Sequence, residues 1–300
     1  MSWRTILIST PSYLSLRNRQ LVIAQADGNV SVPVADLAFI VIEHKQVRMS
    51  VPLLSHLAEE RVGVLFLDQE YLPVGVYLPY NGSFEPLRRY ELQARLSKPK
   101  RKQLWKTIIT AKIRNQRQVL DYFKIDHQLS KLLKDIKSGD VSNREAVAAR
   151  QYWDLIFTGS FLRGERSDFR NIALNYGYAI VRALTARHLA GQGYFTPLGI
   201  HHSNRLNSFN LADDFMEPLR PFVDMRVSEL LLTGMLRSSD MGVKFALTPH
   251  HKQALFEILE SEVKLGGEVF NFLKGTETMI ESFQDALAGT GKLVIPGLNV

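Results

Sequence analysis

The spacing of apolar residues changes near residue 85, and this change limits what the chain can fold into. Before it, TILIST (5–10), YLSLR (13–17) and QLVIAQ (20–25) alternate or stay apolar over lengths typical of strands. After it, apolar residues recur three and four positions apart in almost every segment, which is typical of amphipathic helices. The sequence therefore predicts an α+β multidomain protein, with a β-rich part followed by a helical part.

The β-rich part, residues 1–80, is predicted to be a small sandwich-like domain with one helix. Asp27-Gly28 is a strong hairpin signal between two of its strands. The stretch SVPLLSHLAEE predicts the helix, because Ser50 can cap it and Pro52 suits its first turn. We expect this domain to serve as a scaffold or a dimerisation surface, because it holds no cluster of acids or histidines.

Asn81-Gly82 and Pro86 are turn-forming residues, and they predict a linker at residues 81–87. Residues 88–288 then predict a larger, all-α C-terminal domain, and residues 289–300 a tail without helical period. A chain of 300 residues is long enough for each of two domains to bury a core of its own.

The composition excludes several classes of protein. The chain has no cysteine, which excludes a disulfide framework and a thiolate metal site. Its first residues lack the apolar core of a signal peptide, and no apolar run approaches the roughly 20 residues that a membrane span needs. We therefore expect a cytoplasmic protein with no membrane partner.

Basic residues are concentrated in one segment. Between Arg95 and Arg117 the chain has nine basic residues and no acid. Such a segment repels itself unless something negative lies alongside, whereas an ordinary solvated helix face mixes both signs. The segment predicts contact with nucleic acid, and the candidate side chains are Lys98, Lys100, Arg101, Lys102, Lys106, Lys112, Arg114 and Arg117.

The stretch HHSNRLNSFNLADDFMEP, which begins at His201, places two histidines ahead of three acids. On a helix, Asp214 and Glu217 are three positions apart and share a face, whereas Asp213 points elsewhere. With one imidazole, from His201 or His202, they form an oxygen-rich set that suits Mg²⁺ or Mn²⁺ better than zinc. Acids in a first helical turn also complement the helix dipole, so the spacing alone leaves a metal site and an ordinary helix start both open.

Glu145 is a candidate for a further carboxylate. Ser142 stands three residues before it, and this pair has the pattern of a capping box, in which Glu145 would only satisfy a backbone N–H. From the residues alone, the capping role is favoured.

Three motifs resemble a known family. EAVAARQYW (145–153), NIALNYGYAIVRA (171–183) and LGIHHSNRLNSFNLADDFMEPLRPFVD (198–224) are similar to segments of the CRISPR-associated integrase of the spacer-acquisition complex, the Cas-one family. The resemblance covers nearly the whole chain, and the last motif looks like the form that accompanies type II, single-effector systems. The resemblance implies that the helical part is the catalytic domain.

The resemblance implies a set of site residues. Glu145, His202 and Glu217 fall on the family's metal-binding triad, and Asp214 falls on a further acidic position of the catalytic set. The chain carries glutamate where other forms have aspartate, and both carboxylates can bind a metal. The implied cofactor is one Mg²⁺ or Mn²⁺, and His201 is left to packing or a DNA contact.

The resemblance also implies a reaction and its partners. The family joins the 3′-hydroxyl ends of a captured DNA duplex, the protospacer, to the backbone at the leader end of a CRISPR repeat. It works as homodimers around a small partner protein, Cas-two, and the CRISPR effector is a further candidate partner. Two alternatives stay open: a metal nuclease that acts on branched or damaged DNA without integration, and a DNA-binding subunit without chemistry.

Overall fold

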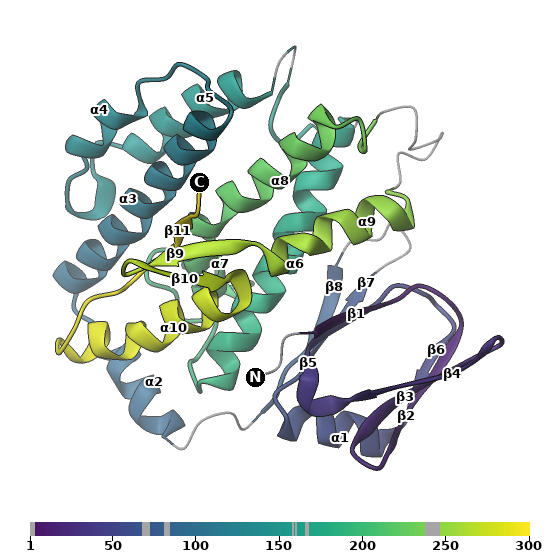
Figure 1. Ribbon diagram of the computed structural model, residues 1–300. Helices are drawn as coiled ribbons and strands as arrows, with labels where there is room; N and C mark the ends of the chain where they lie inside the picture. The colour runs from purple at the N-terminus through teal and green to yellow at the C-terminus, as the bar shows by residue number, and fades with distance from the viewer. Residues whose placement is uncertain are drawn as a thin grey trace. The chain divides into compact units, whose positions relative to one another are not determined.

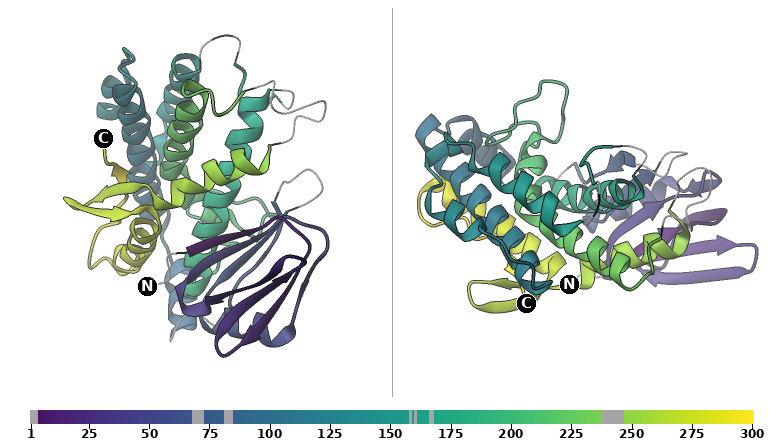
Figure 2. Two further views of the ribbon diagram at one scale, coloured as in Figure 1. Left: turned by 45° about the vertical axis from the view of Figure 1, so that its right-hand side comes forward. Right: turned by 90° about the horizontal axis from the view of Figure 1, so that it is seen from above.

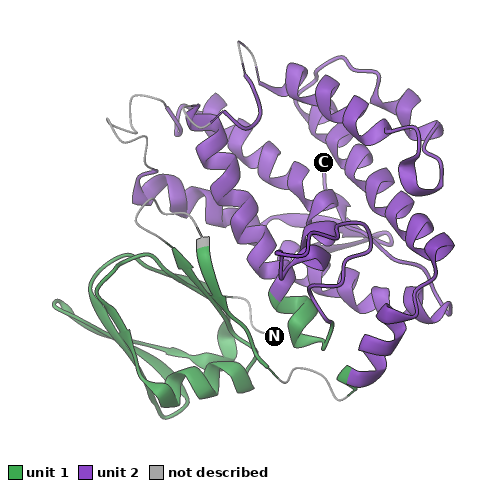
Figure 3. Cartoon of the chain, turned by 180° about the vertical axis from the view of Figure 1, so that it is seen from behind, with its two compact units in different colours: residues 1–86, 187–194 green, residues 87–186, 195–300 purple. Residues whose placement is uncertain are grey.

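The computed structural model describes residues 4–67, 73–80, 85–157, 159, 161–165, 168–237 and 247–300. The chain forms two compact units (Figure 3). Unit 1 contains residues 1–86 together with residues 187–194, and unit 2 contains residues 87–186 and 195–300. Unit 1 is therefore discontinuous in sequence, because the last turn of a long helix of the second half belongs to it.

The described residues of unit 1 form two four-stranded sheets, the helix α1 and a 3₁₀ turn at Val34–Asp36, besides the helix turn from residues 187–194 (Figures 1 and 2). The first sheet has the order β1-β5-β7-β8, with β8 antiparallel to its neighbour and the other pairs parallel. The second has the order β4-β3-β2-β6. The bounds are β1 Arg4–Ile8, β2 Ser12–Arg17, β3 Gln20–Gln25, β4 Gly28–Pro33, β5 Leu37–Ile42, β6 Val47–Met49, α1 Val51–Glu59, β7 Gly63–Leu67 and β8 Pro73–Tyr77.

Both sheets and α1 share one apolar core. Ile40 and Val64 come from the first sheet, Leu14 and Leu21 from the second, and Leu53 from α1, and all are fully buried. Every residue of β5 is buried, as expected of a continuous apolar run. The predicted hairpin at Asp27-Gly28 joins the antiparallel pair β3 and β4. The predicted cap of α1 is also present, because the Ser50 side chain accepts a hydrogen bond from the Leu53 N–H.

Unit 2 is mostly helical. Its α-helices are α2 Pro86–Ala94, α3 Lys98–Tyr122, α4 Leu129–Lys134, α5 Arg144–Ile156, α6 Phe169–Gly191, α7 Asn210–Met216, α8 Arg220–Leu232, α9 Pro249–Phe256 and α10 Phe272–Ala288. Short 3₁₀ turns cover Ser138–Asp140, Glu217–Leu219 and Glu257–Glu260. The long helix α3 contacts α4, α5, α7, α8 and the turn at Glu217–Leu219, so it organises the unit (Figure 1).

The expectation of an all-α C-terminal domain was wrong in one place. Strands β9 (Glu262–Leu265), β10 (Glu268–Asn271) and β11 (Gly297–Leu298) form an antiparallel sheet in the order β10-β9-β11. Gly266 and Gly267 both have positive φ, which is the backbone of a tight hairpin turn. The helix expected to continue to Glu262 and Val263 ends earlier, because α9 stops at Phe256 and these two residues belong to β9.

The expected tail at residues 289–300 was also wrong. Its strand β11 pairs with β9, and Leu293, Ile295 and Leu298 are buried. The segment is held by α3 as well, because the Asn115 Nδ2 donates to the Pro296 carbonyl at 3.0 Å. A short apolar segment has no period of its own, so only its partners reveal that it is ordered.

Candidate active site

Two carboxylates and one ammonium meet at the centre of unit 2. The Lys112 Nζ, on α3, donates to the Glu145 Oε1 of α5 at 2.6 Å. It also donates to the Glu217 Oε2 at 2.6 Å. The side chains of Lys112 and Glu217 are 11% and 7% exposed, whereas that of Glu145 is 28% exposed, so the cluster opens to solvent on the Glu145 side.

Glu145 is free for this cluster because another residue caps its helix. The backbone N–H groups of Arg144 and Glu145 donate to the two carboxylate oxygens of Asp140, each at 2.9 Å. The N-cap residue Asn143 makes no side-chain capping bond. The capping box expected from Ser142 and Glu145 is therefore wrong. A carboxylate from the preceding 3₁₀ turn satisfies the helix start instead.

Glu217 occupies the 3₁₀ turn between α7 and α8. The Arg220 Nε, one turn later, donates to its Oε1 at 2.9 Å. Burial acts to raise the pKa of the Glu217 carboxyl, but the charges and hydrogen bonds of Lys112 and Arg220 lower it to about 2. Glu217 is therefore a buried anion at neutral pH, held by two cations.

Lys112 keeps its proton for the same reason. Burial alone would lower the pKa of its ammonium, but the charges of Glu217 and Glu145 and its hydrogen bonds to them outweigh burial and raise it. Lys112 and Glu217 are thus both charged.

His202 lies in the loop before α7 and is oriented by Asp214. Its Nδ1 is 2.7 Å from the Asp214 Oδ1, and its backbone N–H donates to the same oxygen at 3.0 Å. The hydrogen bond to Asp214 raises the pKa of His202, burial opposes it, and the charges of Asp214, Glu217 and Asp213 add to the increase. A carboxylate on Nδ1 leaves Nε2 as the nitrogen that can bind a ligand.

Asp214 also holds the backbone of the loop that carries His202. It is fully buried, and its other oxygen accepts from the backbone N–H groups of Ile200 and His201. Gly199 allows this approach, because a Cβ there would lie 2.3 Å from the His202 carbonyl oxygen and 2.8 Å from the Asp214 Oδ2. From the spacing, Asp214 was expected to share a helix face with Glu217 as a second carboxylate. In the structure it instead holds the histidine loop, so it is a positioning residue.

The neighbouring residues of the motif serve packing. The His201 ring stacks on Trp105 of α3 at 4.0 Å between centroids, which agrees with the packing role expected for it. His202 meets the same Trp105 edge-on at 5.9 Å. Asp213 points away, as predicted, and pairs with Arg182.

Of the predicted metal triad, Glu145 and Glu217 contact the same group, the Lys112 ammonium, whereas His202 contacts neither carboxylate within the described residues. Within the described part of the chain, no three His, Asp or Glu side chains come together closely enough to hold a metal ion. Glu145 and Glu217 nevertheless share one cation, the Lys112 ammonium, and both offer the hard oxygen atoms that Mg²⁺ and Mn²⁺ prefer. The donor chemistry fits such an ion, and His202 is electrostatically coupled to Glu217.

The basic segment on α3 divides into exposed and structural side chains. Lys98 and Lys102 are exposed, and Lys100 and Lys106 are half-buried. Lys112 departs from the prediction, because it is buried and bound to carboxylates. A run of like charges in sequence does not reveal which of them lie on the buried face of a helix.

Two of the arginines on α3 hold other parts of the chain. Arg101 Nη1 donates to the Gly199 carbonyl at 2.8 Å, so it anchors the histidine loop. Arg114 donates to the Ile295 carbonyl at 3.3 Å. Arg117 pairs with Asp121 at 3.4 Å on the helix surface.

Tyr178 and Asp224 support Arg220, and the sequence did not indicate them. The Arg220 guanidinium lies over the Tyr178 ring at 4.7 Å, and the Tyr178 hydroxyl donates to Asp224. Burial raises the pKa of Asp224 to about 7, although the hydrogen bond from Tyr178 and the charges of Arg163 and Arg220 oppose it. The three-residue spacing of Glu217 and Arg220 was a usable signal, whereas nothing in the sequence indicated the contact with Tyr178.

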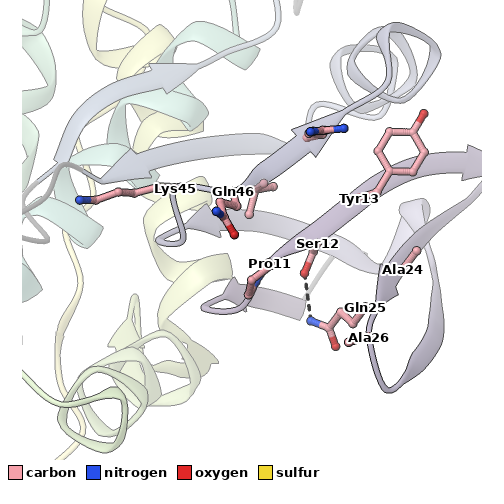
Figure 4. A pocket seen from close by; sticks show the side chains of 10 residues that line it. Pro11, Ser12, Tyr13, Ala24, Gln25, Ala26, Lys45 and Gln46 are labelled. Carbon is pink, nitrogen blue, oxygen red and sulfur yellow. Dashed lines mark hydrogen bonds between the residues drawn. The ribbon is translucent and has the colours of Figure 1, made fainter.

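Unit 1 has a cavity of its own, of about 670 Å³ (Figure 4). The Gln25 Nε2 donates to the Ser12 Oγ across it at 3.0 Å. Lys45 and Arg48 line it together with small and polar side chains, but no acid or histidine does. The candidate chemistry therefore lies in unit 2.

The carboxylates of Glu145 and Glu217 and the imidazole of His202 are donor types that metal-dependent phosphoryl-transfer proteins use. A family model described as CRISPR associated protein Cas1 matches residues 6–260. The CRISPR-associated endonuclease Cas1 of Neisseria meningitidis serogroup C (strain 8013) is 40% identical over 287 residues, which cover 95% of this chain and 92% of that protein. The chain belongs to the Cas1 family, the family that its motifs resemble.

Solved structures share the fold at lower identity. A casposase bound to integration product has a TM-score of 0.81 at 21% identity, and the match covers 98% of this chain and 92% of that chain. A Cas6-RT-Cas1–Cas2 complex has a TM-score of 0.72 at 16% identity, and the match covers 96% of this chain and 35% of that chain. Among the described residues, no helix is long and apolar enough to cross a membrane.

Proposed function

We propose that this chain is a divalent-metal-dependent DNA endonuclease and integrase of CRISPR adaptation, which inserts short double-stranded spacers into a CRISPR array. The observation that carries the proposal is the convergence of Glu145 and Glu217 on one cation position, each 2.6 Å from it. The name of the Neisseria relative supports nuclease chemistry, and the casposase fold is consistent with strand joining. The non-catalytic alternative needed Glu145 to be only a capping residue, a role that Asp140 fills.

In this proposal Glu145, His202 and Glu217 hold one Mg²⁺ or Mn²⁺. When bound, such an ion polarises the scissile phosphate and offsets the charge that develops around phosphorus. Arg220 keeps the Glu217 carboxylate oriented and ionised. Asp214 holds the His202 Nδ1, so that Nε2 faces the reaction as a ligand or a proton carrier.

The reaction is a transesterification. The 3′-hydroxyl oxygen of the captured duplex forms a bond to phosphorus and loses its proton, while the bond from phosphorus to the 3′-oxygen of the cut strand breaks and that oxygen takes up a proton to become the new 3′-hydroxyl. Water in place of the hydroxyl gives hydrolysis, so the same residues account for endonuclease activity.

The proposed partners follow the same reasoning. The exposed and half-buried lysines of α3 contact DNA phosphates without reading sequence, namely Lys98, Lys100, Lys102 and Lys106. The protein works as a homodimer with a Cas2 partner, which the fold shared with a Cas1–Cas2 complex supports.

A joining assay tests this function. A labelled short duplex with free 3′-hydroxyl ends is incubated with the protein, its Cas2 partner, Mn²⁺ and a plasmid that carries the repeat. We expect labelled plasmid from the wild type and a loss of at least about a hundredfold from Glu217→Gln, because one metal ligand is lost.

The control is Glu268→Gln, which removes an exposed carboxylate on β10 and should leave joining unchanged. DNA cutting without joined product, even with the partner present, would overturn the integrase and favour a nuclease. Full joining activity in Glu217→Gln would overturn the ligand assignment.

A further inference from the structure

Lys112 has a position that neither DNA contact nor metal ligation explains. Its ammonium is the cation on which Glu145 and Glu217 converge, and its side chain is only 11% exposed. Two of its three donors are used on carboxylate oxygens at 2.6 Å. In this arrangement Lys112 occupies the place where the proposed metal ion would be shared.

The charges of the cluster balance without a metal. Lys112 and Arg220 supply two positive charges, and Glu145 and Glu217 supply two negative ones. A divalent ion on the same carboxylates would meet a buried ammonium and leave two excess positive charges in a site with little solvent. Phosphate groups of DNA are the anions that can compensate this excess.

We propose that Lys112 couples metal binding to DNA binding by acting as a counter-ion that the metal must displace. This rests on the proposed function. In the free protein Lys112 neutralises Glu145 and Glu217. When metal and DNA bind together, the ammonium leaves the carboxylates and pairs with a backbone phosphate.

The geometry gives the exchange a route. Of the two carboxylates, Glu145 is the more exposed, at 28% against 7% for Glu217, so metal and phosphate approach from its side. The lysine side chain is flexible and carries a compact charge, so a rotation of its outer bonds moves the ammonium without moving α3. Arg220 stays on the other oxygen of Glu217 and preserves that anchor.

Coupling of this kind is reciprocal, so DNA must raise the affinity for metal by the same factor by which metal raises the affinity for DNA. The affinity for Mn²⁺ can be measured from the electron paramagnetic resonance signal of the free ion. Each protein is titrated alone and with a short duplex that has 3′-dideoxy ends, which cannot be joined. The variants are Lys112→Met, which removes the charge, and Lys112→Gln, which keeps N–H donors without it.

In the wild type, we expect the duplex to raise the affinity for Mn²⁺ about tenfold or more. In Lys112→Met, the affinity for Mn²⁺ without DNA should rise by about the same factor, and the effect of DNA should nearly vanish. Lys112→Gln should behave like Lys112→Met, and it carries the test if the methionine variant does not fold. An affinity without DNA at or below that of the wild type would overturn the proposal, as would an unchanged effect of DNA.

Two controls separate this proposal from the proposed function. Lys292→Met removes an exposed lysine outside the cluster and should bind Mn²⁺ like the wild type. If Glu217→Gln loses Mn²⁺ binding while both Lys112 variants bind as the wild type does, the metal site stands and the exchange is wrong. If Glu217→Gln binds Mn²⁺ unchanged, the metal site itself is wrong and the exchange falls with it.

Discussion

Asp214 illustrates what a single buried carboxylate does at this site. It accepts backbone hydrogen bonds from residues 200–202 and holds the His202 ring. An unpaired carboxylate with no exposure would be costly, so these bonds compensate its burial while they fix the loop. The residue whose spacing suggested a metal ligand therefore orients the imidazole of His202.

Replacing Asp214 by asparagine should lower the pKa of His202 toward its ordinary value, because the hydrogen bond to Asp214 is the largest cause of the increase. It should also reduce the free energy of unfolding by about 1–3 kcal/mol, since an amide NH₂ would face backbone donors. An NMR titration of the imidazole and urea unfolding measure the two effects. Asp213→Asn, a more distant charge, should lower the pKa less; an equal decrease would contradict the assignment.

The raised pKa of Asp224 predicts that the stability of the protein depends on pH. Its pKa is raised to about 7 in the folded protein, so between about pH 4 and pH 7 the folded state binds a proton that the unfolded state has lost. The free energy of unfolding should therefore fall as the pH rises through this window, by an amount on the order of a few kcal/mol. In Asp224→Asn this part of the decrease should disappear. Urea unfolding at a series of pH values compares the two, and parallel curves would show that Asp224 ionises normally.

Helix α3 combines three tasks on its faces. Its buried face supplies Lys112 and Asn115, its start anchors the histidine loop through Arg101, and its exposed side carries lysines. Helical periodicity separates these tasks, because residues three or four apart share a face while their neighbours do not.

Removing the two exposed lysines, Lys98 and Lys102, should weaken the binding of DNA of any sequence. In the double variant Lys98→Gln, Lys102→Gln, the slope of log affinity against log salt should become shallower by about 1.8, as expected for two lost phosphate contacts. Fluorescence anisotropy at several salt concentrations measures it. Lys292→Gln serves as the matched control, and a slope equal to that of the wild type would place this side of α3 away from DNA.

At the scale of the whole molecule, the C-terminal segment completes unit 2. Asn115 donates to the Pro218 carbonyl at 2.7 Å and to the Pro296 carbonyl at 3.0 Å. The last residues are therefore tied to the same side chain as the turn that carries Glu217. The segment that had looked like a tail supports the site.

Deleting residues 294–300 should reduce the free energy of unfolding by about 3–6 kcal/mol, because the buried side chains of Ile295 and Leu298 are lost. It should also reduce metal affinity, since Asn115 loses one of its two carbonyl partners. Urea unfolding and Mn²⁺ titration measure these effects. Deletion of Val300 alone, which is 50% exposed, is the control. A stability equal to the wild type after the longer deletion would contradict the role of the segment.

The sequence by itself determined the two kinds of structure and the motif residues. The change of apolar spacing follows from which face of each element is buried, so the division into a β-rich and a helical part could be read directly. Local signals such as Asp27-Gly28 and Ser50 also succeeded, because a turn or a cap depends only on neighbouring residues. Spacing raised Asp214, Glu217 and one of the two histidines as candidates, and the resemblance selected Glu145, His202 and Glu217.

Only the tertiary structure decided how charges are paired. Lys112 and Glu217 are 105 residues apart, and nothing local indicates that they touch. The loop held by Asp214 and the pairing of β11 likewise depend on contacts between segments that are separated in sequence or lack a period. The physical reason is that the period of buried residues depends on the chain itself and can be seen in the sequence. The partner of a buried charge depends instead on how whole elements pack, and here packing brings Lys112 of α3 between Glu145 of α5 and Glu217 of the 3₁₀ turn.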